Sequence, residues 1–335
     1  MYSEIIQVED KKINLGIEIL RMFLCFWVLC FHCLKKNKIN YFLFFIAKTK
    51  FFHVPCFCFI SFYFSNNIFF SRIIIKFKKR LQRLLIPYIL WPLLFFIIDN
   101  NLYYNKKISL HDLKLQLIIG RQFSIPLWFL FSMIILTILF IILSIFFKYY
   151  FLFVLQILSI FSYIMQYSHY FYLFEEYKDN VKFSILDTIN ILPLSFLGLI
   201  FSSFNVVENF KPHRKNILFL SHLFIYILLR YDIFVNLGGY GGIIYIFSSI
   251  SFFMGFYLLP LENSHSFIQK IIKQITSYTN GIYCFLHTRI NRFCRIEFGF
   301  NGTLNSCFII YLISYFFSFI GIKLLGKTRL KYLFS

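Results

Sequence analysis

Residues 126–147 read PLWFLFSMIILTILFIILSIFF, an unbroken apolar stretch without a single charged side chain. A helix needs about 20 such residues to cross the hydrocarbon of a bilayer. The stretch is long enough and apolar enough to do so. Residues 126–147 are therefore predicted to form a transmembrane helix.

Similar apolar stretches recur on both sides of this one. The ten candidate spans are residues 13–34, 51–70, 84–98, 126–147, 150–168, 184–204, 217–229, 243–259, 275–293 and 304–325, of which the third and the seventh are short. Charged residues make up 14% of the 335 residues, against about 25% in a soluble domain. We therefore predict an all-α fold, a polytopic membrane helix bundle of about ten transmembrane helices.

The apolar stretches leave no room for a soluble domain, and no internal repeat is present. We expect a single integral membrane domain over residues 1–335, with a cytoplasmic tail at 1–12, a transmembrane bundle at 13–325 and a second cytoplasmic tail at 326–335. The first apolar stretch carries no small-residue cleavage site, so it is expected to be a retained span and not a signal peptide.

The formal net charge of +20 comes from short clusters of Lys and Arg between the apolar stretches. Cations border bilayer spans in this way, so we interpret them as membrane contacts and expect no nucleic-acid partner. The densest cluster lies at residues 72–83, and the positive-inside bias places it in the cytoplasm together with both termini. The basic segments 211–215 and 270–273 are expected to be loops on the same side. Residues 73–85 resemble an amphipathic helix that runs into the third span.

Ionisable side chains inside a span are costly and usually face the protein interior. The first span contains three of them, Glu18, Arg21 and His32. At about 100° per residue, the eleven steps from Arg21 to His32 make three turns plus about 20°, so both lie on one stripe, about 16 Å apart along the axis. Glu18 lies one turn before Arg21, close enough to pair with it. The alternative is a structural salt bridge and an interfacial histidine.

Two further groups of residues attract attention. Arg80 and Arg83 share a helix face, and two guanidinium groups that point the same way suit phosphate binding, although charge anchoring at the bilayer surface explains them as well. His287, with Tyr283 one turn before it, is a second imidazole within a span. The eight cysteines include no C-x-x-C pair and are interpreted as small apolar residues, so no metal site is expected.

Five motifs together resemble the family-three membrane acyltransferases (the acyltransferase 3 family). They occur in the order of that family, and they are Gly16-Ile-Glu-Ile-Leu-Arg21 with His32, Val54-Pro-Cys-Phe-Cys-Phe-Ile-Ser61, Arg80-x-x-Arg83 with Pro87-Tyr88, Pro126-Leu-Trp128-Phe-Leu130, and Gly281-Ile-Tyr283 with His287. The chain departs from the family pattern at Phe62, where the family usually has Gly, and at Glu18, where Asp is commoner. Phe62 does not permit the close backbone approach that Gly does.

The resemblance implies transfer of an acyl group, most often acetyl, from cytoplasmic acyl-CoA to a hydroxyl of a carbohydrate or a lipid-linked glycan. Arg80 and Arg83 would hold the phosphates of the coenzyme. His32 would act as general base on the acceptor, and Arg21, held by Glu18, would stabilise charge on the thioester oxygen. Residues expected around the substrates are Ser61, Trp128, Tyr283 and His287. Acyl-CoA would be a substrate, with no permanently bound cofactor.

Two other functions are compatible with this sequence. Some relatives are proposed to be non-catalytic glycan exporters, and a degenerate paralogue that binds only membrane lipid is a third possibility. A transporter needs a continuous polar path, and the spans contain few polar residues beyond those named. This favours the enzyme. The acceptor, the acyl chain, the oligomeric state and the choice between direct and covalent transfer are left open.

Overall fold

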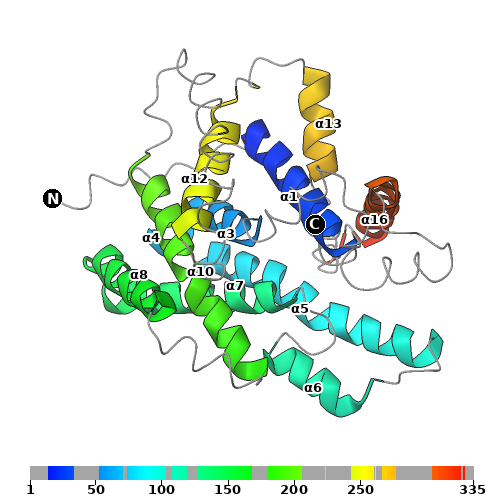
Figure 1. The fold of residues 1–335 in the computed structure, drawn as a ribbon, viewed down its shortest axis with the longest axis horizontal. Helices are drawn as coiled ribbons and strands as arrows, with labels where there is room; N and C mark the ends of the chain where they lie inside the picture. The colour runs from blue at the N-terminus through cyan, green and yellow to red at the C-terminus, as the bar shows by residue number, and fades with distance from the viewer. Residues whose placement is uncertain are drawn as a thin grey trace. The chain divides into compact units, whose positions relative to one another are not determined.

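The structure is a computed structural model that describes residues 14–33, 53–70, 74–102, 108–119, 127–167, 180–205, 223, 243–259, 261, 266–276, 304–325 and 327–328. Every regular element in these ranges is an α-helix, as the all-α prediction requires (Figure 1). The helices are α1 (Leu15–Cys33), α3 (His53–Tyr63), α4 (Asn66–Phe70), α5 (Ile74–Leu102), α6 (Leu110–Ile119), α7 (Leu127–Phe146), α8 (Phe151–Tyr167), α10 (Asn180–Ser203), α12 (Ile243–Tyr257), α13 (Ser266–Thr276) and α16 (Leu304–Leu325).

Four helices in the described ranges are long and apolar enough to cross a membrane. The qualifying stretches are Ile74–Ile97 of α5, Leu127–Phe146 of α7, Ile185–Ser203 of α10 and Cys307–Leu325 of α16. Three shorter apolar helices are α3, α8 and α12. All but residue 223 of the seventh predicted span and most of the ninth lie outside the described residues, so the number of about ten spans stays a prediction.

The chain forms two compact units, each built from three separated segments. The first unit comprises Met1–Arg21, Phe51–Lys78 and Ile135–Ile272, and the second comprises Met22–Lys50, Lys79–Ile134 and Lys273–Ser335. Because the segments alternate along the chain, the two units do not correspond to two consecutive domains of the sequence.

The centre of the first unit is α3, which contacts both α10 and α12. This helix is apolar on all sides, and a helix of that kind has to be buried all round. Phe59 and Tyr63 are fully buried, and their rings lie 4.8 Å and 4.7 Å from the ring of Phe253 on α12. Such ring pairs are more favourable than their buried area alone suggests. Aromatic packing therefore joins α3 to α12.

On its other side α3 meets α10 backbone to backbone, at Gly198. A Cβ atom at this position would lie 2.5 Å from the carbonyl oxygen of Phe59 and 3.1 Å from the amide nitrogen of Tyr63. Only glycine permits this distance. Close by, the thiol of Cys58 and the hydroxyl of Ser195 lie 2.9 Å apart. The close contact of α3 and α10 therefore depends on the absence of a Cβ atom at Gly198.

Helix α10 continues through Pro193, although proline cannot donate the hydrogen bond that the carbonyl of Ile189 would normally accept. The hydroxyl of Ser162 on α8 donates to this carbonyl at 2.5 Å. In an apolar environment a carbonyl without a partner is costly, and hydroxyl side chains of neighbouring helices commonly provide one. The bond from Ser162 thus compensates for Pro193 and joins α8 to α10.

The predicted span 51–70 is not one helix in the structure. Within the described residues it comprises α3 and α4, separated by a turn at Phe64 and Ser65. The Ser65 hydroxyl donates to the carbonyl of Ser61 at 2.6 Å, and the Ser65 amide donates to the carbonyl of Phe62 at 3.1 Å. Local bonds of this kind compete with the regular helix pattern. The continuous span was therefore a wrong prediction here.

In the second unit, polar side chains connect the end of α5 to α6. Asn100 accepts a hydrogen bond from the amide of Ile108 and donates to the carbonyl of the same residue. Ser109 and Asp112 then cap the start of α6 reciprocally. The Tyr88 hydroxyl lies 2.8 Å from the carbonyl of Leu117, near the other end of α6. These bonds satisfy groups that helix ends leave unpaired.

Two short helices are not expected from the sequence. The apolar pattern predicts no element at α6, and residues 270–273 are expected to form a basic loop, whereas they lie inside α13. Both helices are only about three turns long, so neither resembles a span. The amphipathic segment 73–85, by contrast, does continue as a helix into the third predicted span, within α5.

We expect Gly198→Ala to destabilise the protein. The added methyl group would collide with the backbone of α3, and overpacking of this kind costs about 1–3 kcal/mol, more than the gain of up to about 1 kcal/mol in helix propensity. Thermal unfolding in detergent should show a lower midpoint. The control is Ile185→Ala, at an exposed position of α10. Equal midpoints for the two variants would contradict the close approach.

Candidate active site

Glu18 and Arg21 form an ion pair on α1. Nη1 of Arg21 lies 3.2 Å from Oε1 and 3.4 Å from Oε2 of Glu18. The side chains are 16% exposed for Glu18 and 29% exposed for Arg21, so the pair is partly shielded from solvent. Glu18 lies in the first turn, where the helix dipole favours a carboxylate. The predicted pairing is confirmed.

Asn14 anchors the start of α1, four residues before Glu18. Its Oδ1 accepts a hydrogen bond from the amide of Ile17 at 3.2 Å, so Asn14 is the N-cap of the helix. Its Nδ2 donates to the carbonyl of Tyr257 at 2.9 Å, at the end of α12. One amide side chain thus satisfies an amide at the beginning of α1 and a carbonyl at the end of α12.

Gly16 brings the backbones of the same two helices into contact. A Cβ atom at this position would collide with the carbonyl oxygen of Phe256. Glycine is therefore required here. Together with Asn14, this contact fixes the first turns of α1 against α12, and so it positions the Glu18–Arg21 pair.

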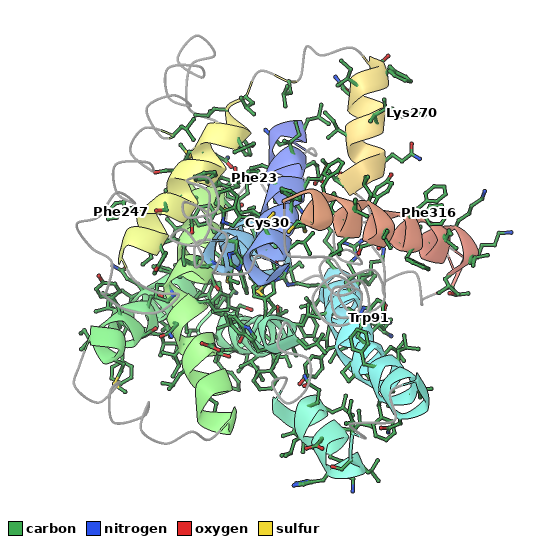
Figure 2. The ribbon with its side chains drawn as sticks, turned by 45° about the vertical axis from the view of Figure 1, so that its right-hand side comes forward. Phe23, Cys30, Trp91, Phe247, Lys270 and Phe316 are labelled. Carbon is green, nitrogen blue, oxygen red and sulfur yellow. The ribbon has the colours of Figure 1, made fainter. Side chains whose placement is uncertain are left out.

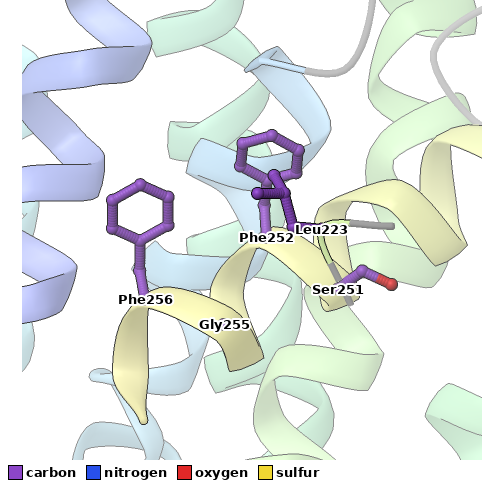
Figure 3. Close-up of a pocket in the computed structure, with 5 residues that line it drawn as sticks. All are labelled: Leu223, Ser251, Phe252, Gly255 and Phe256. Atoms are coloured by element: carbon purple, nitrogen blue, oxygen red, sulfur yellow. The ribbon is translucent and has the colours of Figure 1, made fainter. Parts of the chain in front are cut away.

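The adjacent face of α12 lines a small apolar pocket (Figure 3). The residues around it are Leu223, Ser251, Phe252, Gly255 and Phe256. The enclosed space is about that of one water molecule, and it offers few polar partners. This pocket is therefore too small to be a substrate site.

Arg80 and Arg83 lie in the second unit, three residues apart on one face of α5. Arg80 is partly buried and Arg83 is exposed. Three lysines share this basic section of the helix, namely Lys76, Lys78 and Lys79. The section passes without interruption into the apolar part of α5. A dense positive charge thus lies at the end of a candidate membrane span.

The overall pattern is that of apolar helices with an internal ion pair at the start of one and clustered arginines at the start of another. A family model described as an acyltransferase domain matches residues 14–333. The chain belongs to the acyltransferase 3 family. Comparisons with curated proteins and with solved structures gave no match. Family membership and the candidate spans together make the chain a membrane acyltransferase.

The motif from Val54 to Ser61 lies within α3 of this acyltransferase. Ser61 is partly buried, and its carbonyl accepts the bond from Ser65 that begins the turn. Phe62, which occupies the usual glycine position of the family, is fully buried, with its ring 4.9 Å from that of Phe140. The glycine that permits close packing on α3 is Gly198 of α10 instead.

Trp128 lies in the first turn of α7 and is 4% exposed. Its ring packs edge-to-face on Phe129 at 6.2 Å. A tryptophan of an aromatic belt would be largely exposed at the membrane interface. The burial of Trp128 is therefore not that of a belt residue and favours a position inside the bundle.

The structure brings together Glu18 and Arg21 of the predicted site. His32 lies in the last turn of α1, and its side chain is outside the described residues, as are Tyr283 and His287 entirely. Arg80, Arg83 and Trp128 belong to the second unit and Ser61 to the first. The catalytic and binding roles of these residues stay predictions.

No group of three or more potential metal ligands occurs among the described side chains. The cysteines described there are buried, namely Cys25, Cys30, Cys56, Cys58 and Cys307. They pack as small residues, and the thiol of Cys56 lies 3.7 Å from the carbonyl of Ser249. Their burial is that of the small apolar residues expected from the sequence.

Asn14 and the packing role of Gly16 are absent from the predictions made from the sequence. An asparagine directly before an apolar helical stretch is a typical N-cap signal, so one half of the role of Asn14 was available from sequence. Its bond to Tyr257 joins residues far apart in the chain, and no local pattern predicts it. The same holds for the contact of Gly16 with Phe256.

We expect Arg21→Lys to lose nearly as much acyltransferase activity as Arg21→Ala. Lysine keeps the positive charge but lacks the planar guanidinium. That group can donate to Glu18 and at the same time to an oxygen of the substrate. Initial rates of acyl transfer test this, with Lys323→Ala on α16 as a control for removal of a cation. A fully active Arg21→Lys enzyme would show that charge alone suffices.

Proposed function

We propose that this membrane acyltransferase moves an acyl group, most often acetyl, from cytoplasmic acyl-CoA to a hydroxyl of a carbohydrate or of a lipid-linked glycan. The observation that carries the proposal is the Glu18–Arg21 pair, anchored through Asn14 and Gly16 on the helix that also contains His32. An apolar helix tolerates such residues at a cost, which a functional role explains.

The proposed transfer needs one base. His32 accepts the proton of the acceptor hydroxyl while the hydroxyl oxygen attacks the carbonyl carbon of the thioester. A carbon–oxygen bond forms and the carbon–sulfur bond breaks. Coenzyme A leaves as the thiol after recovering the proton from the imidazole. Histidine suits this exchange because its unperturbed pKa lies near neutral pH.

Arg21 is proposed to stabilise negative charge on the thioester oxygen. Side chains of a helix lean toward its N-terminus, and Glu18 holds the Arg21 guanidinium on that side. Arg21 and His32 therefore act at levels about 16 Å apart along the axis. Direct transfer requires the guanidinium to turn away from Glu18 toward the carbonyl.

Arg80 and Arg83 are proposed to bind the phosphate groups of the donor. Guanidinium groups form paired hydrogen bonds to phosphate oxygens, which lysine cannot reproduce. Their position at the start of a candidate span suits a donor that approaches from the aqueous side, and the positive-inside bias makes that side the cytoplasm.

The central experiment follows labelled acetyl from acetyl-coenzyme A to candidate glycans with the purified protein in lipid. His32→Ala is expected to lower the transfer rate by about 10²–10⁴-fold, the usual contribution of a positioned acid–base group. His111→Ala, at an exposed histidine of α6, is the control. A transfer rate of His32→Ala within a factor of about ten of the wild-type rate would show that His32 is not the general base. Absence of transfer to any glycan by the wild-type protein would favour the exporter.

Arg80→Ala combined with Arg83→Ala is expected to raise the KM for acetyl-coenzyme A much more than the KM for the acceptor. The matched control combines Lys78→Ala with Lys79→Ala, which removes two exposed charges from the same turn of α5. Steady-state kinetics with each substrate varied in turn give the comparison. Equal changes in both KM values, or equal effects of the two double variants, would mean that the arginines only anchor the helix.

A further inference from the structure

Helix α13 (Ser266–Thr276) has the sequence SFIQKIIKQIT, which divides cleanly into two faces. At about 100° per residue, Phe267, Ile268, Ile271 and Ile272 fall within an arc of about 140°. The polar positions, among them Gln269 and Lys270, occupy the rest of the circle. Such a division is typical of a helix that lies between an apolar and an aqueous medium.

The apolar face of α13 is exposed in the structure. Phe267 is 65% exposed, Ile268 47% and Ile271 39%. The contrast with α3 is informative, because both helices have 11 residues. Helix α3 is apolar on every side and nearly all of its residues are buried, whereas α13 is apolar on one side and large parts of Phe267, Ile268 and Ile271 on that side are exposed. Because contact of apolar side chains with water is unfavourable, the exposed face of α13 requires an apolar environment.

The position of α13 in the chain determines which surrounding it meets. At about 16 Å, it is too short to cross about 30 Å of hydrocarbon. Helix α12 ends at Tyr257, and residues 258–265 that follow reach about 30 Å at most when fully extended. Since α12 belongs to a predicted span, α13 cannot move far from the surface of the bilayer. Lipid is thus the apolar medium within its reach.

The charge of α13 determines which lipids it prefers. The helix contains Lys270 and Lys273 and no acidic residue. Lys270 lies on the polar side and is exposed (Figure 2). A lysine beside an inserted apolar face meets lipid headgroups, and each such cation attracts anionic ones. Attraction of this kind does not arise with a zwitterionic surface.

We propose that α13 is an interfacial helix that inserts Phe267, Ile268 and Ile271 into one leaflet and binds its anionic headgroups through Lys270. The helix lies parallel to the membrane plane, with its apolar side toward the acyl chains. This surface is separate from the proposed acyl-transfer residues, and it recognises lipid independently of the substrates.

A photo-crosslinker locates the occupant of this face directly. p-Benzoylphenylalanine replaces Phe267 in the full-length protein, which is placed in nanodiscs of equal parts phosphatidylglycerol and phosphatidylcholine. Irradiation is expected to give lipid adducts, identified by mass spectrometry, several-fold more often than with the same probe at Gln269 on the polar side. Ile271 serves as a second probe position if the protein with a probe at 267 does not fold.

The composition of the adducts tests the role of Lys270. Phosphatidylglycerol adducts should outnumber phosphatidylcholine adducts, and Lys270→Gln should lower this ratio by about fivefold, the effect of one interfacial lysine. Lys114→Gln on α6, a helix without separate polar and apolar faces, should leave the ratio unchanged. Adducts to protein, in the same or a second copy, or equal lipid adducts at 267 and 269 would overturn the insertion. An unchanged ratio of phosphatidylglycerol to phosphatidylcholine adducts in the Lys270→Gln variant would overturn the headgroup contact.

Discussion

A backbone in hydrocarbon has no water to pair with, and most of the structure follows from this constraint. A regular helix meets it internally, which explains why apolar stretches of this chain are helical. The exceptions occur where the helix pattern is interrupted, and there a side chain supplies the missing partner. Ser162 donates to the carbonyl that Pro193 leaves unpaired, and Asn14 serves two helix ends at once. These two polar side chains of the first unit therefore lie at interruptions of the backbone pattern.

The second determinant is the distance at which helices meet. Apolar association in lipid gains little from the hydrophobic effect, so packing and small residues decide it. Gly16 and Gly198 each bring two backbones together, the first between α1 and α12 and the second between α10 and α3. Because α3 also packs on α12, these contacts link α1, α12, α3 and α10 in series. The Glu18–Arg21 pair stands at one end of this series.

The sequence predicted features that depend on local pattern and missed those that depend on distant contacts. The predicted last span, residues 304–325, has the bounds of α16, because its ends follow from where apolar residues begin and stop. The Glu18–Arg21 pair was predictable from spacing alone. The break after Tyr63 depends on the bonds of a single serine, and the helix at 266–276 was hidden because two lysines suggested a loop. The tertiary partners of Asn14 and Gly16 have no signature in sequence.

The mutual neutralisation of Glu18 and Arg21 has an electrical consequence. Moving one elementary charge across a membrane potential of 100 mV involves about 2.3 kcal/mol, so a lone arginine within a span feels a force along the membrane normal whenever the potential changes. A carboxylate held 3.2 Å from the guanidinium nitrogen makes the net charge of the pair zero. The force on the guanidinium is then balanced by an opposite force on the carboxylate three residues away. Helix α1 can hold an arginine near its start without that arginine acting as a voltage sensor.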